Sequence, residues 1–246
     1  MIDIKKIEEE LVSYLEEFDH SKEKIALKHE HSLEVVKVMN MIVSKMNLTE
    51  EDKNLALTIA YLHDIGRFEQ LVKIGKFDDF IYDHADNGVD LLFNRGLIKK
   101  FSIPEEYYRI INVAIKNHNK LSIEEGLTDQ ELFYSKLIRD ADKIDIFRVR
   151  HKYNQDLFLE TPNSENIKDF YDHKSIDLKN RVSKSDAILC VLAFVYDLNF
   201  KESFDVLKEL DYLNMYISSI KVDDSVKEEF NGYIEEINKY MEDYNE

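Results

Sequence analysis

The scarcity of chain-breaking residues limits what this sequence can fold into. Only 6 glycines and 2 prolines occur among 246 residues, whereas average usage is about 7% and 5%. Sheets need many turns, and turns favour Gly, Pro, Asn and Asp. Leu, Ile, Glu and Lys, which favour helices, are abundant instead. The composition therefore predicts an all-α fold.

Apolar residues recur at helical spacing along most of the chain. This spacing predicts N-terminal helices over residues 3–18, 23–46, 49–65, 84–94, 102–117 and 128–148. Residues 66–82 are predicted to be a looser stretch, and Thr49 begins a pattern typical of a helix cap. Residues 151–184 predict a long loop with one short helix, followed by helices over residues 185–197, 200–219 and 223–244.

The sequence becomes polar and loses its clear helical periodicity near residue 150, which suggests a domain division. We expect a helical core over residues 1–150 and a loop with a C-terminal helical cap over residues 151–246. The alternative is one continuous domain in which 151–184 is a long internal loop.

Charge and cysteine content exclude several classes of protein. The net charge is −17, which makes duplex nucleic acid and anionic membranes poor partners. The single cysteine, Cys190, cannot form an intrachain disulfide, and its apolar neighbours predict a small core residue. The longest apolar run, 187–196, is too short for a membrane span of about 20 residues. With no segment of signal-peptide type, we expect a cytoplasmic protein.

An adjacent His63-Asp64 pair ends the apolar stretch LTIAYLHDIGRF. Neighbouring helical residues diverge by about 100°, so the pair cannot share one helix face. At a helix end that faces a cavity, however, the two side chains can approach one metal from two sides. The alternative is a solvated helix C-terminus, where the helix dipole favours histidine.

Two further residues extend this pattern. His31 lies on the preceding amphipathic segment, and Asp142 interrupts the apolar side of KLIRDADKIDIF. A buried carboxylate must be paired or must coordinate a metal. The alternative for this segment is a polar edge with Asp145 and Arg148 exposed, which we expect to hold for Asp145.

In this order, His31, His63-Asp64 and Asp142 resemble the HD superfamily of metal-dependent phosphohydrolases. DHADNGVDLLF, which contains His84, and KNHNK, which contains His118, resemble segments of its two-metal members, including the HD-GYP branch. The resemblance covers about residues 25–150 and implies a helical bundle, to which the C-terminal helices would be a helical extension. No GYP motif is present, so turnover of cyclic dinucleotides is not implied.

The resemblance implies a role for each matching residue. His31, His63, Asp64 and Asp142 would hold a first metal. Asp64 would bridge to a second metal, held additionally by His84 and His118. Imidazole and carboxylate ligands suit one or two divalent ions among Fe, Mn, Ni, Co and Zn. A bridging water is then the expected nucleophile.

Basic residues near these motifs are candidates to neutralise a substrate phosphate. Lys143 directly follows Asp142, and Arg67 lies one turn beyond His63 if the helix persists past Gly66. We expect catalytic roles for Asp64, Arg67 and Lys143, and substrate binding by Arg67, Lys143 and Arg148. The alternative for Arg148 is pairing with a neighbouring acid one turn away.

The leading functional hypothesis is a metal-dependent phosphohydrolase acting on a phosphate ester or anhydride of a small molecule, foremost a nucleotide. One alternative is a di-iron oxygenase of the same superfamily, which oxygen uptake would reveal. Another is a non-catalytic nucleotide-binding sensor, which would bind ligand without turnover. The sequence leaves the oligomeric state open, a homodimer being one alternative.

Overall fold

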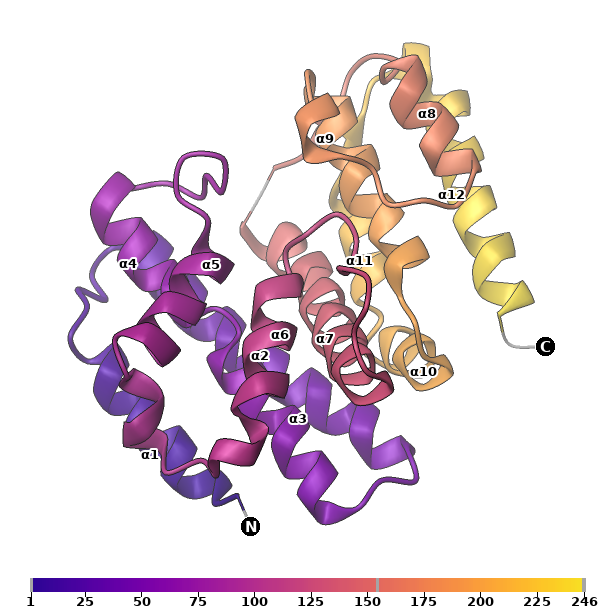
Figure 1. Cartoon of the computed structure of the whole chain (residues 1–246). Coiled ribbons are helices and arrows are strands. Elements are labelled where there is room, and N and C mark those ends of the chain that lie inside the picture. The colour runs from indigo at the N-terminus through magenta and orange to yellow at the C-terminus, as the bar shows by residue number, and fades with distance from the viewer. Residues whose placement is uncertain (1, 154, 245–246) are drawn as a thin grey trace. The chain divides into compact units, whose positions relative to one another are not determined.

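A computed structural model describes residues 2–153 and 155–244 of the chain (Figure 1). Helices make up nearly all of its regular structure, which confirms the all-α prediction. The chain divides into two compact units, Met1–Asp142 and Lys143–Glu246. The predicted division at residue 150 and its one-domain alternative stay predictions.

The first unit is built from helices and short helical turns. Their bounds are α1 Ile4–Leu15, α2 Glu23–Lys45, α3 Glu50–Leu62, α4 Ile65–Ile74, α5 His84–Val89, the π-helix Asp90–Asn94, the 3-10 turns Leu97–Phe101 and Glu105–Tyr107, and α6 Tyr108–Asn117. Helix α7, Asp129–Tyr153, runs through the boundary between the units.

The helices of the first unit pack through their apolar faces. Helix α2 packs against α3, α3 against α1, α4 against α5, and α5 against α6 (Figure 1). Fully buried residues on these faces include Val35, Ile42, Ile59, Ala85 and Ile111. Thr49 caps α3 by accepting a hydrogen bond from the Asp52 backbone N–H, as predicted.

The predicted end of the third helix at residue 65 is wrong. The beginning of the looser stretch predicted over residues 66–82 is also wrong. Helix α3 ends at Leu62, and α4 continues from Ile65 to Ile74. The backbone of Asp64, at φ −103° and ψ 13°, leaves the helical conformation and separates the two helices. Burial of Phe68 and Leu71 then stabilises α4, which the sequence analysis missed.

The second unit contains the remaining elements. Their bounds are β1 Leu157–Phe158, α8 Ser164–Tyr171, the 3-10 turn Leu178–Asn180, α9 Lys184–Leu192, the 3-10 turn Ala193–Asp197, α10 Lys201–Leu210, α11 Tyr212–Ser219, β2 Lys221–Val222, the 3-10 turn Asp224–Val226 and α12 Lys227–Asp243.

Two features of this unit differ from the sequence-based expectation. The single helix predicted over residues 200–219 is two helices, because Asp211 adopts a left-handed conformation at φ 57°. Strands β1 and β2 pair in parallel, with Leu157 opposite Lys221. Cys190 lies buried in α9, which confirms its prediction as a core residue.

Candidate metal centre

Five elements or junctions of the first unit bring the six predicted metal ligands together. Each side chain is buried or nearly so. His31 lies in α2, His63 and Asp64 between α3 and α4, His84 at the start of α5, His118 at the end of α6, and Asp142 in α7.

The break between α3 and α4 explains how adjacent residues reach one site. His63 and Asp64 occupy the turn between the helices rather than consecutive positions of one helix. Their side chains therefore approach the site from two sides, as the sequence analysis required if both were to contact one metal. The alternative of a solvated helix end is wrong, because His63 is fully buried and Asp64 is 2% exposed.

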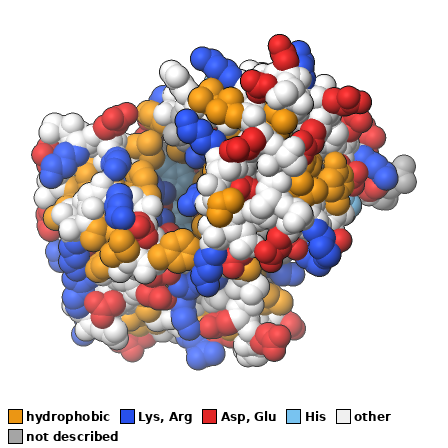
Figure 2. Space-filling model, turned by 90° about the horizontal axis from the view of Figure 1, so that it is seen from above, with side chains coloured by type: hydrophobic (Ala, Val, Ile, Leu, Met, Phe, Trp, Pro, Cys, Tyr) orange, Lys and Arg blue, Asp and Glu red, His pale blue; other side chains and the backbone are white. Residues whose placement is uncertain are grey.

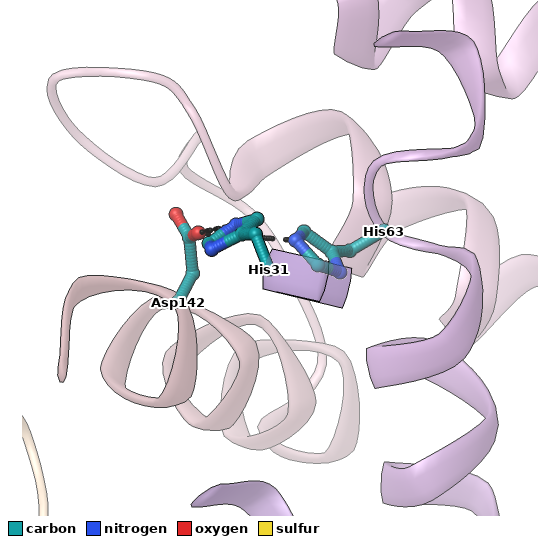
Figure 3. Close-up of side chains that lie close together, drawn as sticks. All are labelled: His31, His63 and Asp142. Atoms are coloured by element: carbon teal, nitrogen blue, oxygen red, sulfur yellow. Dashed lines mark ion pairs between the residues drawn. The ribbon is translucent and has the colours of Figure 1, made fainter. Parts of the chain in front are cut away.

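One group of ligand atoms gathers around Asp142. His31 Nε2 lies 3.0 Å from Asp142 Oδ1, and His63 Nε2 lies 3.8 Å from the same oxygen. Asp64 Oδ2 lies 3.5 Å from Nε2 of both histidines. Figure 3 shows His31, His63 and Asp142 pointing toward one another from separate elements. These atoms form a cluster that could hold one metal ion.

A second group gathers around the other oxygen of Asp64. His84 Nε2 lies 3.1 Å from Asp64 Oδ1, and His118 Nε2 lies 3.9 Å from it. The two Nε2 atoms of His84 and His118 are 2.9 Å apart. Asp64 therefore presents one oxygen to each cluster, as a bridging carboxylate would.

Backbone contacts fix the orientation of two of these imidazoles. His63 Nδ1 lies 2.7 Å from the Ala60 carbonyl, and His118 Nδ1 lies 2.6 Å from the Ile115 carbonyl. A carbonyl can only accept, so each Nδ1 carries the proton and each Nε2 presents its lone pair inward. This is the arrangement that metal-binding histidines usually adopt.

The donor set fits divalent transition metals. Two ligands each about 2.1 Å from one ion lie about 3.0–3.4 Å apart, close to the distance between the His84 and His118 nitrogens. Two inward lone pairs at that distance repel unless a cation or proton lies between them. In addition, the buried His63 Nε2 makes no hydrogen bond within the described residues.

Burial keeps two of the histidines in the neutral form that binds metal. Desolvation lowers the pKa of His63, and it lowers the pKa of His118 well below the ordinary value. Neutral imidazole is required for coordination, so these groups need not lose a proton when metal binds near neutral pH.

Lys28 is a residue of this centre that the sequence analysis missed. Its Nζ contacts Asp64 Oδ2 from α2, one turn before His31. Burial acts to raise the pKa of Asp64, but Lys28 and the neighbouring histidines outweigh it and hold the pKa well below its usual range. Asp142 behaves similarly, its pKa being lowered by His31 against the effect of burial. Both carboxylates are therefore ionised, as metal binding requires.

Arg67, a predicted substrate-binding residue, lies at the edge of the second cluster. Its Nη2 lies 3.0 Å from His84 Nε2. The guanidinium donates hydrogen bonds to Asp79 Oδ1 at 2.9 Å and to Gln70 Oε1 at 2.7 Å, and it lies over the ring of Phe77. The positive charge that was expected at the centre is thus present, partly balanced by Asp79.

Lys143 and Arg148, the other predicted substrate-binding residues, belong to the second unit. Lys143 Nζ lies 2.6 Å from Asp197 Oδ2, and Arg148 Nη2 donates to Asp145 Oδ2 at 3.0 Å. The alternative of pairing at one-turn spacing is therefore observed for Arg148. The expected exposure of Asp145 is wrong, because the buried carboxylate is balanced by this arginine.

Comparison with known proteins identifies the fold around this centre. The family model of the HD domain matches residues 29–146, a range that includes all six candidate ligands. The chain contains an HD domain. HD domains bind divalent metals and are mostly metal-dependent hydrolases. This agrees with two overlapping groups of side chains that could each hold an ion: His31, His63 and Asp142, and His63, Asp64 and His118. Neither the curated proteins nor the solved structures compared with the chain gave a match. Within the described residues, no helix has the length and apolar character to cross a membrane.

Proposed function

We propose that this protein is a metal-dependent phosphohydrolase that cleaves a phosphate ester or anhydride of a small phosphorylated molecule, foremost a nucleotide. The observation that supports this most strongly is Asp64, which presents its two oxygens to two separate clusters of histidines. In this proposal His31, His63 and Asp142 hold one metal, His84 and His118 hold a second, and Asp64 bridges them.

The chemistry that such metals supply when bound is polarisation of a phosphoryl oxygen and activation of water near neutral pH. Arg67 borders the centre and can donate paired hydrogen bonds to substrate phosphate oxygens. Lys143 follows Asp142 directly in α7 and stays a proposed phosphate-binding residue. A similar role for Arg148 requires its pair with Asp145 to open.

The charge of the chain supports a small substrate over duplex nucleic acid. With a net charge of −17, long-range repulsion of a polyphosphate backbone opposes binding. On the face drawn in Figure 2, acidic and basic side chains are interspersed. A compact substrate whose phosphate reaches the metal centre avoids most of this repulsion.

The first experiment is elemental analysis of protein purified without chelator. We expect about two metals per chain, falling to about one in the double variant His84→Ala/His118→Ala. A matched control is His20→Ala/His173→Ala, which removes two exposed histidines and should leave the metal content unchanged. A protein that binds no Mn, Fe, Co or Ni after loading contradicts the proposed centre.

The second experiment tests the reaction itself. The metal-loaded protein is screened for phosphate release from p-nitrophenyl phosphate and from nucleoside mono-, di- and triphosphates. We expect release above the level of the double variant carrying the same metal. Loaded protein that binds nucleotide without turnover supports a sensor instead, and oxygen consumption by the iron form supports an oxygenase.

A further inference from the structure

Asp79, in the loop between α4 and α5, is the hub of a hydrogen-bond network beside the second cluster. Its Oδ1 lies 2.6 Å from His84 Nδ1 and accepts from Arg67 Nη1 and Gln70 Nε2, each at 2.9 Å. The backbone N–H of His84 also donates to this oxygen, at 3.3 Å. One carboxylate therefore contacts a candidate metal ligand and the cation next to it.

The contact with Asp79 determines which nitrogen of His84 faces the centre. Asp79 Oδ1 lies 2.6 Å from His84 Nδ1, where a carboxylate oxygen can accept the Nδ1 proton. Nε2 is then the ring nitrogen that faces Asp64 Oδ1, at 3.1 Å. His63 and His118 are oriented by backbone carbonyls of their own helices. His84 Nδ1 instead contacts side chains, Asp79 Oδ1 at 2.6 Å and, more distantly, Asn119 Nδ2 at 3.4 Å.

Asp79 also controls the position of a competing cation. Arg67 Nη2 lies 3.0 Å from His84 Nε2, where it can donate to the lone pair that a metal would need. Asp79 draws the guanidinium through two contacts, Nη1 to Oδ1 at 2.9 Å and Nη2 to Oδ2 at 3.3 Å. Without this carboxylate, Arg67 would keep its ion pair with Asp64, whose Oδ1 lies 3.7 Å from Nε, and that pair would draw the guanidinium toward the second cluster.

We propose that Asp79 is a positioning residue that makes the second metal position available. It holds His84 with Nε2 inward and restrains the guanidinium of Arg67. The second position would thereby depend on the loop over residues 75–83, while the first position would not. This inference rests on the proposed two-metal centre.

The first test uses Zn²⁺, which is diamagnetic and suits these ligands. Side-chain ¹⁵N spectra of the histidines in Zn²⁺-loaded protein report which ring nitrogen carries the proton. We expect His84 to be protonated at Nδ1 in the unaltered protein and to lose this preference in Asp79→Ala. The control is Asp78→Ala, which removes a loop carboxylate that accepts from the Phe80 and Ile81 backbone N–H groups. An unchanged His84 tautomer in Asp79→Ala overturns the proposal.

The second test is a titration of chelator-treated protein with Mn²⁺. We expect two binding steps, of which Asp79→Ala weakens the second by about 10- to 100-fold and leaves the first within about threefold. Asp78→Ala should alter neither step by more than about threefold. If Asp79→Ala does not fold, Asp79→Asn takes its place and should weaken the same step, because its amide no longer balances Arg67.

The two proposals fail in different ways. A single step in the unaltered protein overturns the two-metal centre, and with it the role of Asp79 in metal binding. Two steps that are equally tight in the unaltered protein and in Asp79→Ala overturn only the role of Asp79. Equal weakening of the second step by Asp78→Ala also overturns it, because the effect would then come from general disruption of the loop.

Discussion

A Cβ atom placed on Gly66 would lie 2.3 Å from the backbone oxygen of His84. It would also lie 2.4 Å from the backbone nitrogen of Gly88. Helices α4 and α5 therefore approach each other backbone to backbone, and only glycine permits that approach at position 66. The close contact brings the start of α5, and with it His84, next to Asp64.

Gly66→Ala is expected to lower the free energy of unfolding by about 3 kcal/mol, because rigid backbone atoms must shift to admit the methyl group. The displacement of α5 should also reduce metal content toward one ion per chain. Urea denaturation and elemental analysis measure the two effects.

Gly88→Ala is the matched control for this prediction. A Cβ atom there meets its nearest neighbour at 3.4 Å, an ordinary contact distance. Alanine also gains about 1 kcal/mol of helix propensity over glycine, so this variant should be about as stable as the unaltered protein. Equal stability of the two variants would contradict the tight approach at Gly66.

Local patterns singled out part of the candidate centre, and the resemblance to the HD superfamily supplied His84, His118 and the metal-binding roles. His63-Asp64 ends an apolar helix, and Asp142 interrupts another, so each stands out as a polar group where burial is expected. The structure brings these residues together with His31, as the order of motifs implied. These residues could be recognised because a charged or polar side chain in a segment predicted to be buried needs a partner.

Residues that act through long-range contacts gave no comparable signal. Asp79 lies next to another aspartate in a predicted loop, and Lys28 lies in a charged helix segment, so a carboxylate or an ammonium is ordinary at these positions. Only the fold places Asp79 against His84 and Lys28 against Asp64. The expected exposure of Asp145 was wrong for a related reason. Tertiary packing, rather than the local sequence pattern, buries α7 at this position.

Lys28→Met is expected to destabilise the metal-free protein selectively. Loss of the ammonium leaves Asp64 ionised and buried with less compensation, at a cost of about 3 kcal/mol. Metal that binds only the folded state should restore much of this loss. Urea denaturation of chelator-treated and Mn²⁺-loaded protein measures both values.

The control for Lys28 is Lys37→Met, on the same helix. Lys37 forms an exposed pair with Glu34, so its loss should change stability by less than about 1 kcal/mol in either state. If Lys28→Met lost the same amount with and without Mn²⁺, its effect would come from packing rather than from charge.

Arg139→Met is expected to lower the melting temperature by about 6–12 °C. The buried guanidinium donates to the carbonyls of Asn117, Lys120 and Leu121, at 2.8, 2.6 and 3.3 Å. Leaving such acceptors unsatisfied costs about 3 kcal/mol in sum, and each kcal/mol shifts the midpoint by about 2–4 °C in a chain of this size. Differential scanning calorimetry measures the shift.

The exposed Arg109 provides the comparison for Arg139. Its mostly exposed guanidinium pairs with the buried Glu131, which keeps its hydrogen bonds from Thr128 when the arginine is lost, so Arg109→Met should lower the midpoint by less than about 4 °C. Similar midpoints for the two variants would show that the carbonyl contacts of Arg139 add little to stability.

Cys190 is expected to resist thiol reagents in the folded protein. It is 1% exposed, and burial raises the pKa of its thiol to about 12. At pH 8, dithionitrobenzoate should therefore label it only after urea is added. In the unfolded chain the thiol titrates near about pH 8.5, so above that pH unfolding releases a proton and becomes more favourable. Between pH 7.5 and 9.5 the unaltered protein should lose about 1 kcal/mol of unfolding free energy relative to Cys190→Ala. A constant difference across this range, or rapid labelling without urea, would contradict the buried neutral thiol.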